Sequence, residues 1–191
     1  MVVIGLTGGI AVGKTTICNR LKNDGFQIID ADEIVHILYQ SDSSVIREIS
    51  KHYPSAYEKG QINRKKLAQL VVNNANILAH IESILHSALK NYIQNILNQK
   101  TTQLIILSAP LLFETGFDCF CDKIICLYAS KKTQRLRALQ RSDMTSKKFE
   151  ILYRNQWTNT QRKKMCTLWI STETSEQETY QTIIQFLKKY A

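Results

Sequence analysis

A glycine-rich segment near the start of the chain has the residues and spacing of a phosphate-binding loop. Residues 8–15 read Gly-Gly-Ile-Ala-Val-Gly-Lys-Thr and fit the pattern G-x-x-x-x-G-K-[ST]. Such a loop points successive backbone N–H groups at one anion, and the helix after it adds its positive N-terminal end. Lys14 is then placed to reach the β- and γ-phosphates of a nucleotide, and the Thr15 hydroxyl to bind Mg²⁺. The remaining predicted phosphate contacts come from Gly8, Gly9, Ala11, Val12, Gly13 and Thr16.

The surroundings of this segment support a functional loop over a glycine-rich turn without a ligand. An apolar run, Val2–Leu6, precedes it, and a helix-forming stretch follows from Lys14. The four fixed positions of the motif therefore lie in the required strand, loop, helix order. The sequence predicts that this end of the chain binds nucleotide phosphates.

Two further segments place polar residues where predicted strands end. Asp30-Ala31-Asp32 follows the apolar run Phe26–Ile29, and the segment 108–114 follows Leu104–Leu107. In an open parallel sheet, ligands bind at the carboxyl ends of the strands, so we expect all three segments to converge on one crevice. A carboxylate there can accept a proton from an attacking hydroxyl or bind Mg²⁺-coordinated water. The alternative for Asp30 or Asp32 is capping of the next helix, and both readings can hold for the pair.

The pattern of apolar runs and helical stretches predicts an α/β fold with a parallel sheet and helices on both faces. The expected strands are Val2–Leu6, Phe26–Ile29, Leu104–Leu107, Ile124–Tyr128 and Leu168–Ser171. The expected helices are Lys14–Asn23, a stretch from Ile34 to about Gln40, one capped near Asp42 and running through Lys51, one capped by Asn63 and running through Val72, the stripe Ile81–Leu97, Lys131–Gln140, Thr145–Asn155, and one that starts on a capping box of Ser175 with Glu178. Residues 57–61 are expected to form a polar turn.

Charge and composition narrow the range of partners. The 191 residues carry a net charge of +9, which raises nucleic acid as a partner. The basic residues are spread along the chain without the interleaved aromatic residues of a base-stacking surface, so a polyphosphate small molecule is favoured over nucleic acid. No apolar run approaches the roughly 20 residues that span a bilayer, and no signal peptide is recognisable, so a cytoplasmic protein without a membrane partner is expected.

The cysteines indicate a reducing compartment. The five are scattered, their number is odd, and none forms a C-x-x-C pair. A metal site built on Cys119 and Cys121 is disfavoured because no second pair and no suitably spaced histidine completes it.

The end of the strand Leu104–Leu107 argues against a motor or switch protein. Many phosphate-loop NTPases hold Mg²⁺ with an aspartate at the end of such a strand, and this chain has Ser108 there. The basic helices between Lys131 and Arg162 favour a mobile flap that closes on phosphates, as in small kinases. The alternative for these helices is a solvated surface.

Several motifs together resemble one family. The segment Leu-Thr-Gly-Gly-Ile lies before Gly13-Lys14-Thr15, and it is followed by Ile29-Asp30-Ala31-Asp32 and by Pro110-Leu111-Leu112-Phe113-Glu114. In the basic region, matching positions are Gln134-Arg135, Arg141, Met144-Thr145, Lys148-Phe149 and Gln156. This combination resembles dephospho-coenzyme A kinase over nearly the whole chain. The resemblance implies a three-layer P-loop kinase fold with a central parallel sheet of about five strands. It also implies a core at about 1–60, 98–130 and 165–191, a helical substrate-binding region at about 61–97, and a helical lid at about 131–164.

The resemblance also implies an activity and the residues that carry it. The reaction is transfer of the γ-phosphoryl group of ATP, with Mg²⁺, to the 3′-hydroxyl of the dephospho-CoA ribose, the last step of coenzyme A synthesis. Asp32 would be the base or the group that orients the acceptor hydroxyl. Lys14 and the loop amides would hold the ATP phosphates, Thr15 would bind the Mg²⁺, and Arg141 would reach the nucleotide from the lid. The acceptor would meet Asp32 together with His86, Pro110, Leu111 and Glu114. We expect a monomer whose partners are ATP and dephospho-CoA.

The chain departs from the family pattern at a few positions. Ala11-Val12 stands where the family usually has Gly-Ser, and Ser87 replaces the proline that follows the family's histidine. Ala11 is tolerated if its φ is negative, and Val12 loses a hydroxyl but keeps its backbone N–H, so ATP binding should survive. Two rival functions stay open: a kinase for another nucleoside or small metabolite, and a non-catalytic, nucleotide-dependent nucleic-acid binder.

Overall fold

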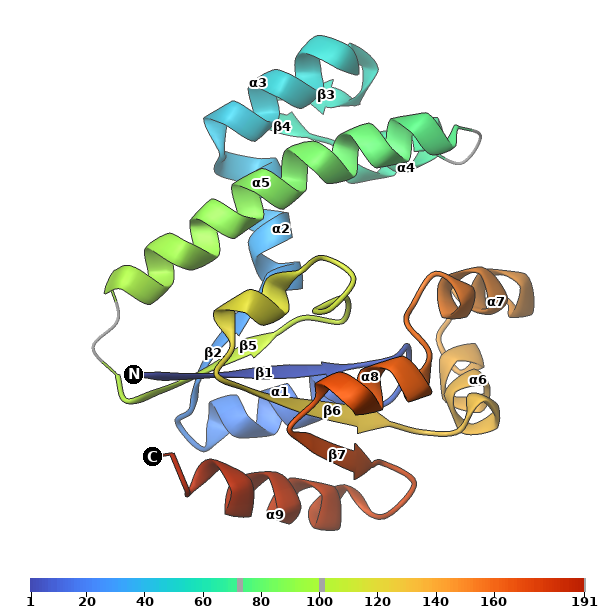
Figure 1. Cartoon of the computed structure of the whole chain (residues 1–191). Coiled ribbons are helices and arrows are strands. Elements are labelled where there is room, and N and C mark those ends of the chain that lie inside the picture. Colours follow the sequence, from blue (N-terminus) through green and yellow to red (C-terminus); the bar gives the residue numbers. More distant parts are fainter. Residues whose placement is uncertain (72–73, 100–101, 191) are drawn as a thin grey trace. The chain divides into compact units, whose positions relative to one another are not determined.

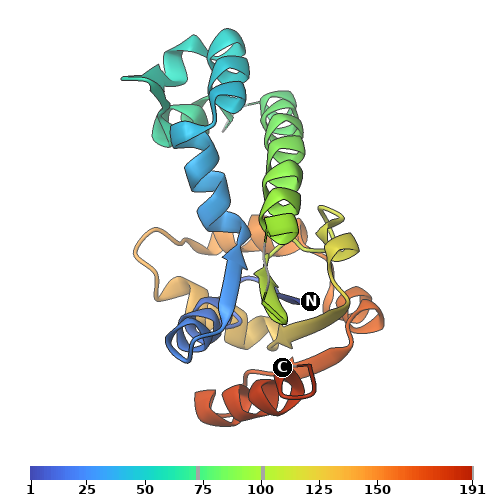
Figure 2. The ribbon, with the colours of Figure 1, turned by 90° about the vertical axis from the view of Figure 1, so that its left-hand side faces the viewer.

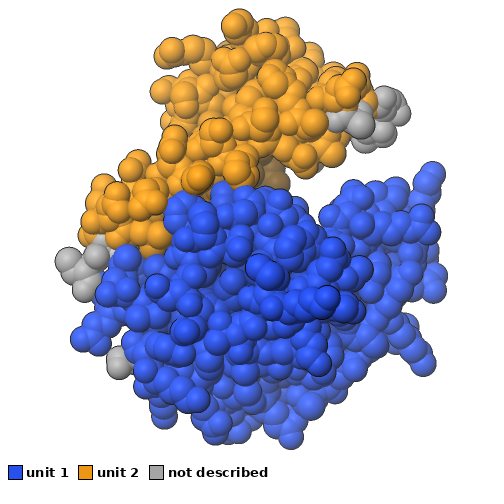
Figure 3. Space-filling view, in the orientation of Figure 1, with its two compact units in different colours: residues 1–29, 101–191 blue, residues 30–100 orange. Residues whose placement is uncertain are grey.

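The chain divides into two compact units. The structure is a computed structural model, and it describes residues 1–71, 74–99 and 102–190. One unit comprises residues 1–29 and 101–191, and the other comprises residues 30–100 (Figure 3). The second unit is wider than the helical region expected at 61–97, because it also takes in residues 30–60, which the sequence analysis assigned to the core.

The first unit is built on a five-stranded sheet in the order β2-β5-β1-β6-β7 (Figure 1). The strands are β1 (Val2–Gly8), β2 (Gln27–Asp30), β5 (Leu104–Ser108), β6 (Lys123–Tyr128) and β7 (Leu168–Ser171). β1 is central and pairs in parallel with β5 and β6, and β6 pairs in parallel with β7. This sheet confirms the predicted parallel α/β fold. All five expected strands are present, with ends shifted by one or two residues at most.

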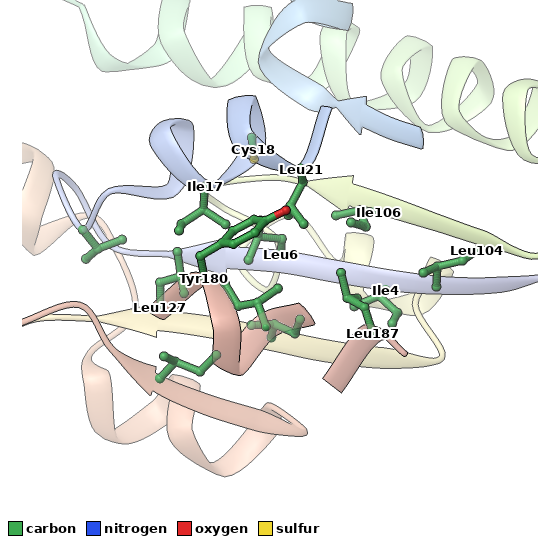
Figure 4. Packing of buried hydrophobic residues seen from close by; sticks show 14 of the residues in the cluster. Ile4, Leu6, Ile17, Cys18, Leu21, Leu104, Ile106, Leu127, Tyr180 and Leu187 are labelled. Atoms are coloured by element: carbon green, nitrogen blue, oxygen red, sulfur yellow. The ribbon is translucent and has the colours of Figure 1, made fainter. Parts of the chain in front are cut away.

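The main core lies between one face of this sheet and two helices. Alternation along β1 sends Ile4 and Leu6 to this face, where both side chains are fully buried. They pack against α1 (Lys14–Asn23) and α9 (Glu176–Leu187), which contribute residues such as Leu21 and Tyr180 (Figure 4). The helix that follows β1 in the sequence and the last helix of the chain therefore share one apolar cluster, which fixes the position of α1 on the sheet.

On the other face of the sheet, the chain approaches β1 closely. A Cβ on Gly5 would lie 2.9 Å from both Cys121 Sγ and Leu112 Cδ2, so glycine is required for this packing. The short 3₁₀ helix η2 (Phe117–Phe120) and α8 (Asn159–Met165) lie on this side, against β1 and β6 respectively. The sheet is thus covered on both faces, as a three-layer fold requires.

Two basic helices and α8 form the region that the sequence analysis assigned to a lid. α6 (Lys131–Leu139) is capped by Ser130, and α7 (Ser146–Arg154) by Thr145, each through a side-chain oxygen. Their facing sides bury Ala138 and Phe149 completely. α8 was not expected as a separate helix, and it begins on a capping box of Thr158 with Gln161.

The second unit is mostly helical. It contains α2 (Ala31–Ser41), α3 (Ser43–His52), the 3₁₀ helix η1 (Pro54–Ala56), α4 (Arg64–Val71) and the long α5 (Ala75–Gln99). Figure 2 shows α2 and α5 side by side, and α3 also contacts α5, so the segment 31–52 groups with α5. Asp42 caps α3 and Asn63 caps the start of α4, as the sequence predicted, while Val72, the predicted end of that helix, lies outside the described residues.

The expected polar turn at 57–61 is a small hairpin. β3 (Tyr57–Glu58) pairs antiparallel with β4 (Gln61–Ile62). The two residues between them, Lys59 and Gly60, both have positive φ, at 48° and 85°. A two-residue connection of this kind requires positive φ at both positions because its twist must match that of the strands.

No helix within the described ranges is long and apolar enough to cross a membrane.

Candidate functional site

The predicted phosphate loop connects the end of β1 to the start of α1. Gly13 is the N-cap of α1 with φ 92°, and it has no side chain that could occupy the free amides of the first helical turn. α1 has no acidic residue in its first turn, and Arg20 and Lys22 lie in its last turn. The start of the helix is therefore electrostatically favourable for an anion.

Ala11 does not meet the condition under which the sequence analysis found it to be tolerated. Its φ is 58°, in the left-handed region, whereas the sequence analysis required a negative value. An L-residue in this region costs about 1–2 kcal/mol per residue relative to the right-handed conformation. The loop therefore holds alanine at a position where glycine would be unstrained.

The beginning of the loop is held by close packing. A Cβ on Gly8 would lie 2.5 Å from the backbone oxygen of Leu127 and 2.8 Å from Val12 Cγ2, so only glycine fits. Val12 itself is 1% exposed and belongs to the main core cluster. The side chain that replaces the family's serine is thus an anchor that fixes the loop to the sheet.

Lys14 is half-buried and lies against the end of β5. Its Nζ donates a hydrogen bond of 2.6 Å to Ser108 Oγ, and Cys18 Sγ lies 3.4 Å from the same oxygen. Ser108 occupies the strand-end position where the sequence analysis noted the missing aspartate. The ammonium group is therefore oriented by a neutral hydroxyl, while the Thr15 and Thr16 side chains at the start of α1 are exposed.

A cavity of about 290 Å³ opens beside the loop. It is bordered by the loop, by the start of α1, by α6 with the turn after it, and by the segment after β7; the lining residues are Ala11, Val12, Gly13, Thr16, Ile17, Arg137, Arg141, Thr172, Thr174, Glu176 and Thr179. The structure thus brings the predicted Arg141 to the same cavity as the phosphate loop. Two arginines and the loop amides give this cavity the chemistry of a polyphosphate site.

Arg137 is a residue of this cavity that the sequence analysis did not single out. Its guanidinium donates two hydrogen bonds to Thr172, at 3.0 Å to Oγ1 and 2.6 Å to the backbone oxygen. It therefore joins α6 to the segment after β7. Arg137 lies in the last turn of α6 and Arg141 in the turn after that helix, so the available signal was only that both belong to the same basic stretch of the sequence.

The segment after β5 is also held by hydrogen bonds. Glu114 Oε1 accepts hydrogen bonds from the Trp157 backbone N–H at 2.7 Å and from Arg162 Nη2 at 3.2 Å. Thr7 Oγ1 donates a hydrogen bond of 3.4 Å to the backbone oxygen of Pro110. The next residue, Leu111, is 39% exposed. The structure thus shows partners for Glu114 within its own unit, and a contact with the acceptor stays a prediction.

The two aspartates after β2 have different local roles. Asp30 Oδ1 accepts hydrogen bonds from the backbone N–H groups of Asp32 and Glu33, at 2.9 and 3.4 Å, and so caps α2. The Asp32 side chain is not needed for this cap and belongs to an exposed residue in the first turn of α2. His86 is half-buried on α5.

The cysteines do not form a metal site among the residues that the structure describes. No cluster of three or more histidine, cysteine, aspartate or glutamate side chains is present in this part of the chain. Burial, reinforced by the nearby Asp118, raises the pKa of the Cys121 thiol to about 12.

Comparison with known proteins identifies relatives of nearly full length. A family model described as dephospho-CoA kinase matches residues 2–178. The dephospho-CoA kinase of Fusobacterium nucleatum is 32% identical over 187 residues, which cover 97% of this chain and 97% of that protein. The dephospho-CoA kinase of the Wolbachia of Brugia malayi is 34% identical over 178 residues, which cover 92% of this chain and 91% of that protein.

Solved structures share the fold. TT1252 from Thermus thermophilus superposes with a TM-score of 0.84 at 23% identity and covers 100% of this chain and 98% of its own. Dephospho-CoA kinase from Campylobacter jejuni gives a TM-score of 0.71 at 24% identity, with 98% of this chain and 96% of its own covered. At these identities the likeness concerns the arrangement of the strands and helices.

Proposed function

Because the chain belongs to the dephospho-CoA kinase family, we propose that it transfers the γ-phosphoryl group of ATP to the 3′-hydroxyl of the dephospho-CoA ribose. The observation that carries this proposal is the cavity bordered by the phosphate loop and by Arg137 and Arg141. A γ-phosphoryl group needs positioning and positive charge more than covalent chemistry, and these residues supply both.

The donor half of the proposed site is formed by the loop and the lid. The uncapped amides at the start of α1 and the backbone of the loop would hold the phosphates of ATP. Lys14 Nζ donates a hydrogen bond to the neutral hydroxyl of Ser108, and from this position it would turn toward the β- and γ-phosphates. Arg141 would contact the nucleotide from the lid side of the cavity.

The same region has an oxygen ligand that suits Mg²⁺. The exposed hydroxyl of Thr15 is a hard donor of the kind that this ion prefers, and water and phosphate oxygens would complete its shell. When bound, Mg²⁺ neutralises charge on the β- and γ-phosphate oxygens. Thr15 is our proposed protein ligand, in line with its place in the motif.

Asp32 is proposed as the base. Asp30 caps α2, and Asp32 lies in the first turn of that helix, two residues after β2 ends, where the family pattern places its catalytic aspartate. In the proposed reaction the 3′-oxygen forms a bond to the γ-phosphorus and its proton passes to Asp32. The bond from the γ-phosphorus to the bridging oxygen breaks, and ADP leaves.

The remaining acceptor contacts are proposed from the family pattern. Pro110 and Leu111 follow β5 at the carboxyl edge of the sheet, where ligands of such sheets bind. Leu111 is exposed despite its apolar side chain, which favours a contact surface. His86 on α5 is proposed to contact the acceptor as well.

An acceptor panel tests this function. ADP formation from ATP should depend on dephospho-CoA and should fall to background with coenzyme A, whose 3′-oxygen already carries a phosphate. Nucleosides and small hydroxylated metabolites serve as comparison acceptors, and higher turnover with one of them would favour the rival kinase. A nucleic-acid binder would instead show tight, steeply salt-dependent binding of oligonucleotides and no acceptor-dependent turnover.

A further inference from the structure

Three side chains from the lid region contact or crowd the first part of the phosphate loop. The Ile10 backbone N–H donates a hydrogen bond of 2.8 Å to Oε1 of Gln156, which follows α7. A Cβ on Gly9 would lie 2.8 Å from Gln134 Oε1 and 3.0 Å from Arg162 Nη1. The backbone of Gly9 and Ile10 is therefore held from one side by residues far away in the sequence.

Behind these contacts lies a buried ion pair. Arg162 Nη2 and Glu114 Oε1 are 3.2 Å apart, with side chains only 3% and 14% exposed. The same Glu114 oxygen accepts the backbone N–H of Trp157, the residue after Gln156. In addition, the rings of Trp157 and Phe113 are stacked, with centroids 5.2 Å apart and planes at 10°. The segment 113–114 and the segment 156–157 are thus fastened together next to the loop.

The stability of the fold alone does not explain this buried ion pair and the polar groups around it. Three buried polar atoms have no hydrogen-bond partner among the described residues: Glu114 Oε2, Gln134 Oε1 and Arg162 Nε. Unpaired buried groups and buried ion pairs both carry a desolvation penalty, and apolar residues of similar volume often serve stability equally well. A role in specifying geometry explains why charged groups stand here.

We propose that the Glu114–Arg162 pair and Gln156 are positioning residues for the phosphate loop. Through Arg162 against Gly9 and Gln156 on Ile10, they set the position of the loop backbone relative to the segment that follows β5. This gives Glu114 a role that differs from the predicted contact with the acceptor, because its Oε1 is already occupied by Trp157 and Arg162. The proposal rests on the proposed function only in taking ATP as the ligand of the loop.

Gln156→Met is the sharpest test, because it removes the acceptor for the Ile10 N–H and keeps the length of the side chain. The dissociation constant of ATP with Mg²⁺, measured by titration calorimetry without acceptor, should rise about fivefold, as loss of one hydrogen bond predicts. Gln185→Met, on the exposed side of α9, is the matched control and should leave the constant within twofold. Because no acceptor is present, this result does not depend on whether dephospho-CoA is the substrate.

The paired replacement Glu114→Leu with Arg162→Met separates positioning from stability. The double variant should unfold within a few degrees of the unaltered protein and bind ATP about tenfold more weakly. The matched control is Lys131→Met with Glu150→Leu, which removes an exposed lid pair of 2.8 Å. ATP affinity within twofold of the unaltered protein in both Gln156→Met and a folded double variant would overturn the proposal. If the double variant fails to fold, the Gln156→Met result decides alone.

Discussion

Replacing Ala11 by glycine should stabilise this protein, against the usual effect of an alanine-to-glycine change. Ala11 has φ 58°, and relief of the left-handed conformation is worth about 1–2 kcal/mol. Glycine also raises the conformational entropy of the unfolded chain, which lowers the free energy of unfolding by about 0.4–1 kcal/mol. The expected net gain in the free energy of unfolding is therefore about 0.5–1 kcal/mol.

Gly13→Ala is the matched reverse change. Gly13 has φ 92°, and an added Cβ would meet no described atom within 4 Å, so only backbone strain and unfolded-chain entropy differ. The same two contributions now act with opposite signs, and a loss of about 0.5–1 kcal/mol is expected.

Urea unfolding followed by circular dichroism measures both variants. The midpoint should rise for Ala11→Gly and fall for Gly13→Ala, with the slope of each transition unchanged. A lower midpoint for Ala11→Gly, or a higher one for Gly13→Ala, would show that the strain argument is mistaken.

Three further predictions concern Gly8 in the phosphate loop, Glu173 after β7, and Arg141 in the lid. Gly8→Ala should destabilise the protein by about 2–3 kcal/mol in the same urea assay, because its Cβ would lie 2.5 Å from the backbone oxygen of Leu127; a smaller loss than for Gly13→Ala would contradict this. Hydrogen bonds from Thr133 and from the start of α6 lower the pKa of Glu173 from its ordinary 4.5 to about 2. Its contribution is therefore present above pH 4.5 and lost as the pH falls toward 2, so Glu173→Gln should lose less stability over that range in acid titrations. Arg141→Met should raise the KM for ATP about tenfold, since it removes a charged hydrogen-bond donor from the cavity, and an unchanged KM would remove Arg141 from the site.

The fold could be predicted because local signals and the global arrangement agree. The strand Leu168–Ser171 and the helix Lys14–Asn23 were predicted with the bounds that the structure has, since each combines an apolar pattern with a clear start or stop. The capping box of Ser175 with Glu178 likewise marked the start of α9. Such features depend on residues within a few positions of one another.

Features that depend on contacts between distant residues could not be predicted from local sequence patterns. The left-handed φ of Ala11 follows from the path of the loop, and alanine gives no signal for it. The hairpin between Tyr57 and Ile62 was taken for a turn because each strand has only two residues. The grouping of residues 30–60 with α5 depends on helix packing that no local pattern reports.

In the candidate site, too, residues of local motifs could be predicted, whereas contacts between distant residues could not. The motif predicted Lys14, and the family pattern predicted Arg141, which the structure places at the cavity beside the loop. The hydrogen bond between Arg137 and Thr172 joins residues that are 35 positions apart in the sequence. The one between Glu114 and Arg162 joins residues that are 48 positions apart. Sequence spacing indicated which residue types were present and left their partners open.

The rate of ADP formation by Asp32→Asn tests the central claim most directly. With ATP and dephospho-CoA, the variant should be slower than the unaltered protein by about 10²- to 10⁴-fold, the contribution of a positioned base, while the dissociation constant of ATP stays within twofold. Glu33→Gln, one position along the same exposed helical turn, is the control and should keep full turnover. Turnover by Asp32→Asn at the rate of the unaltered protein would contradict the account.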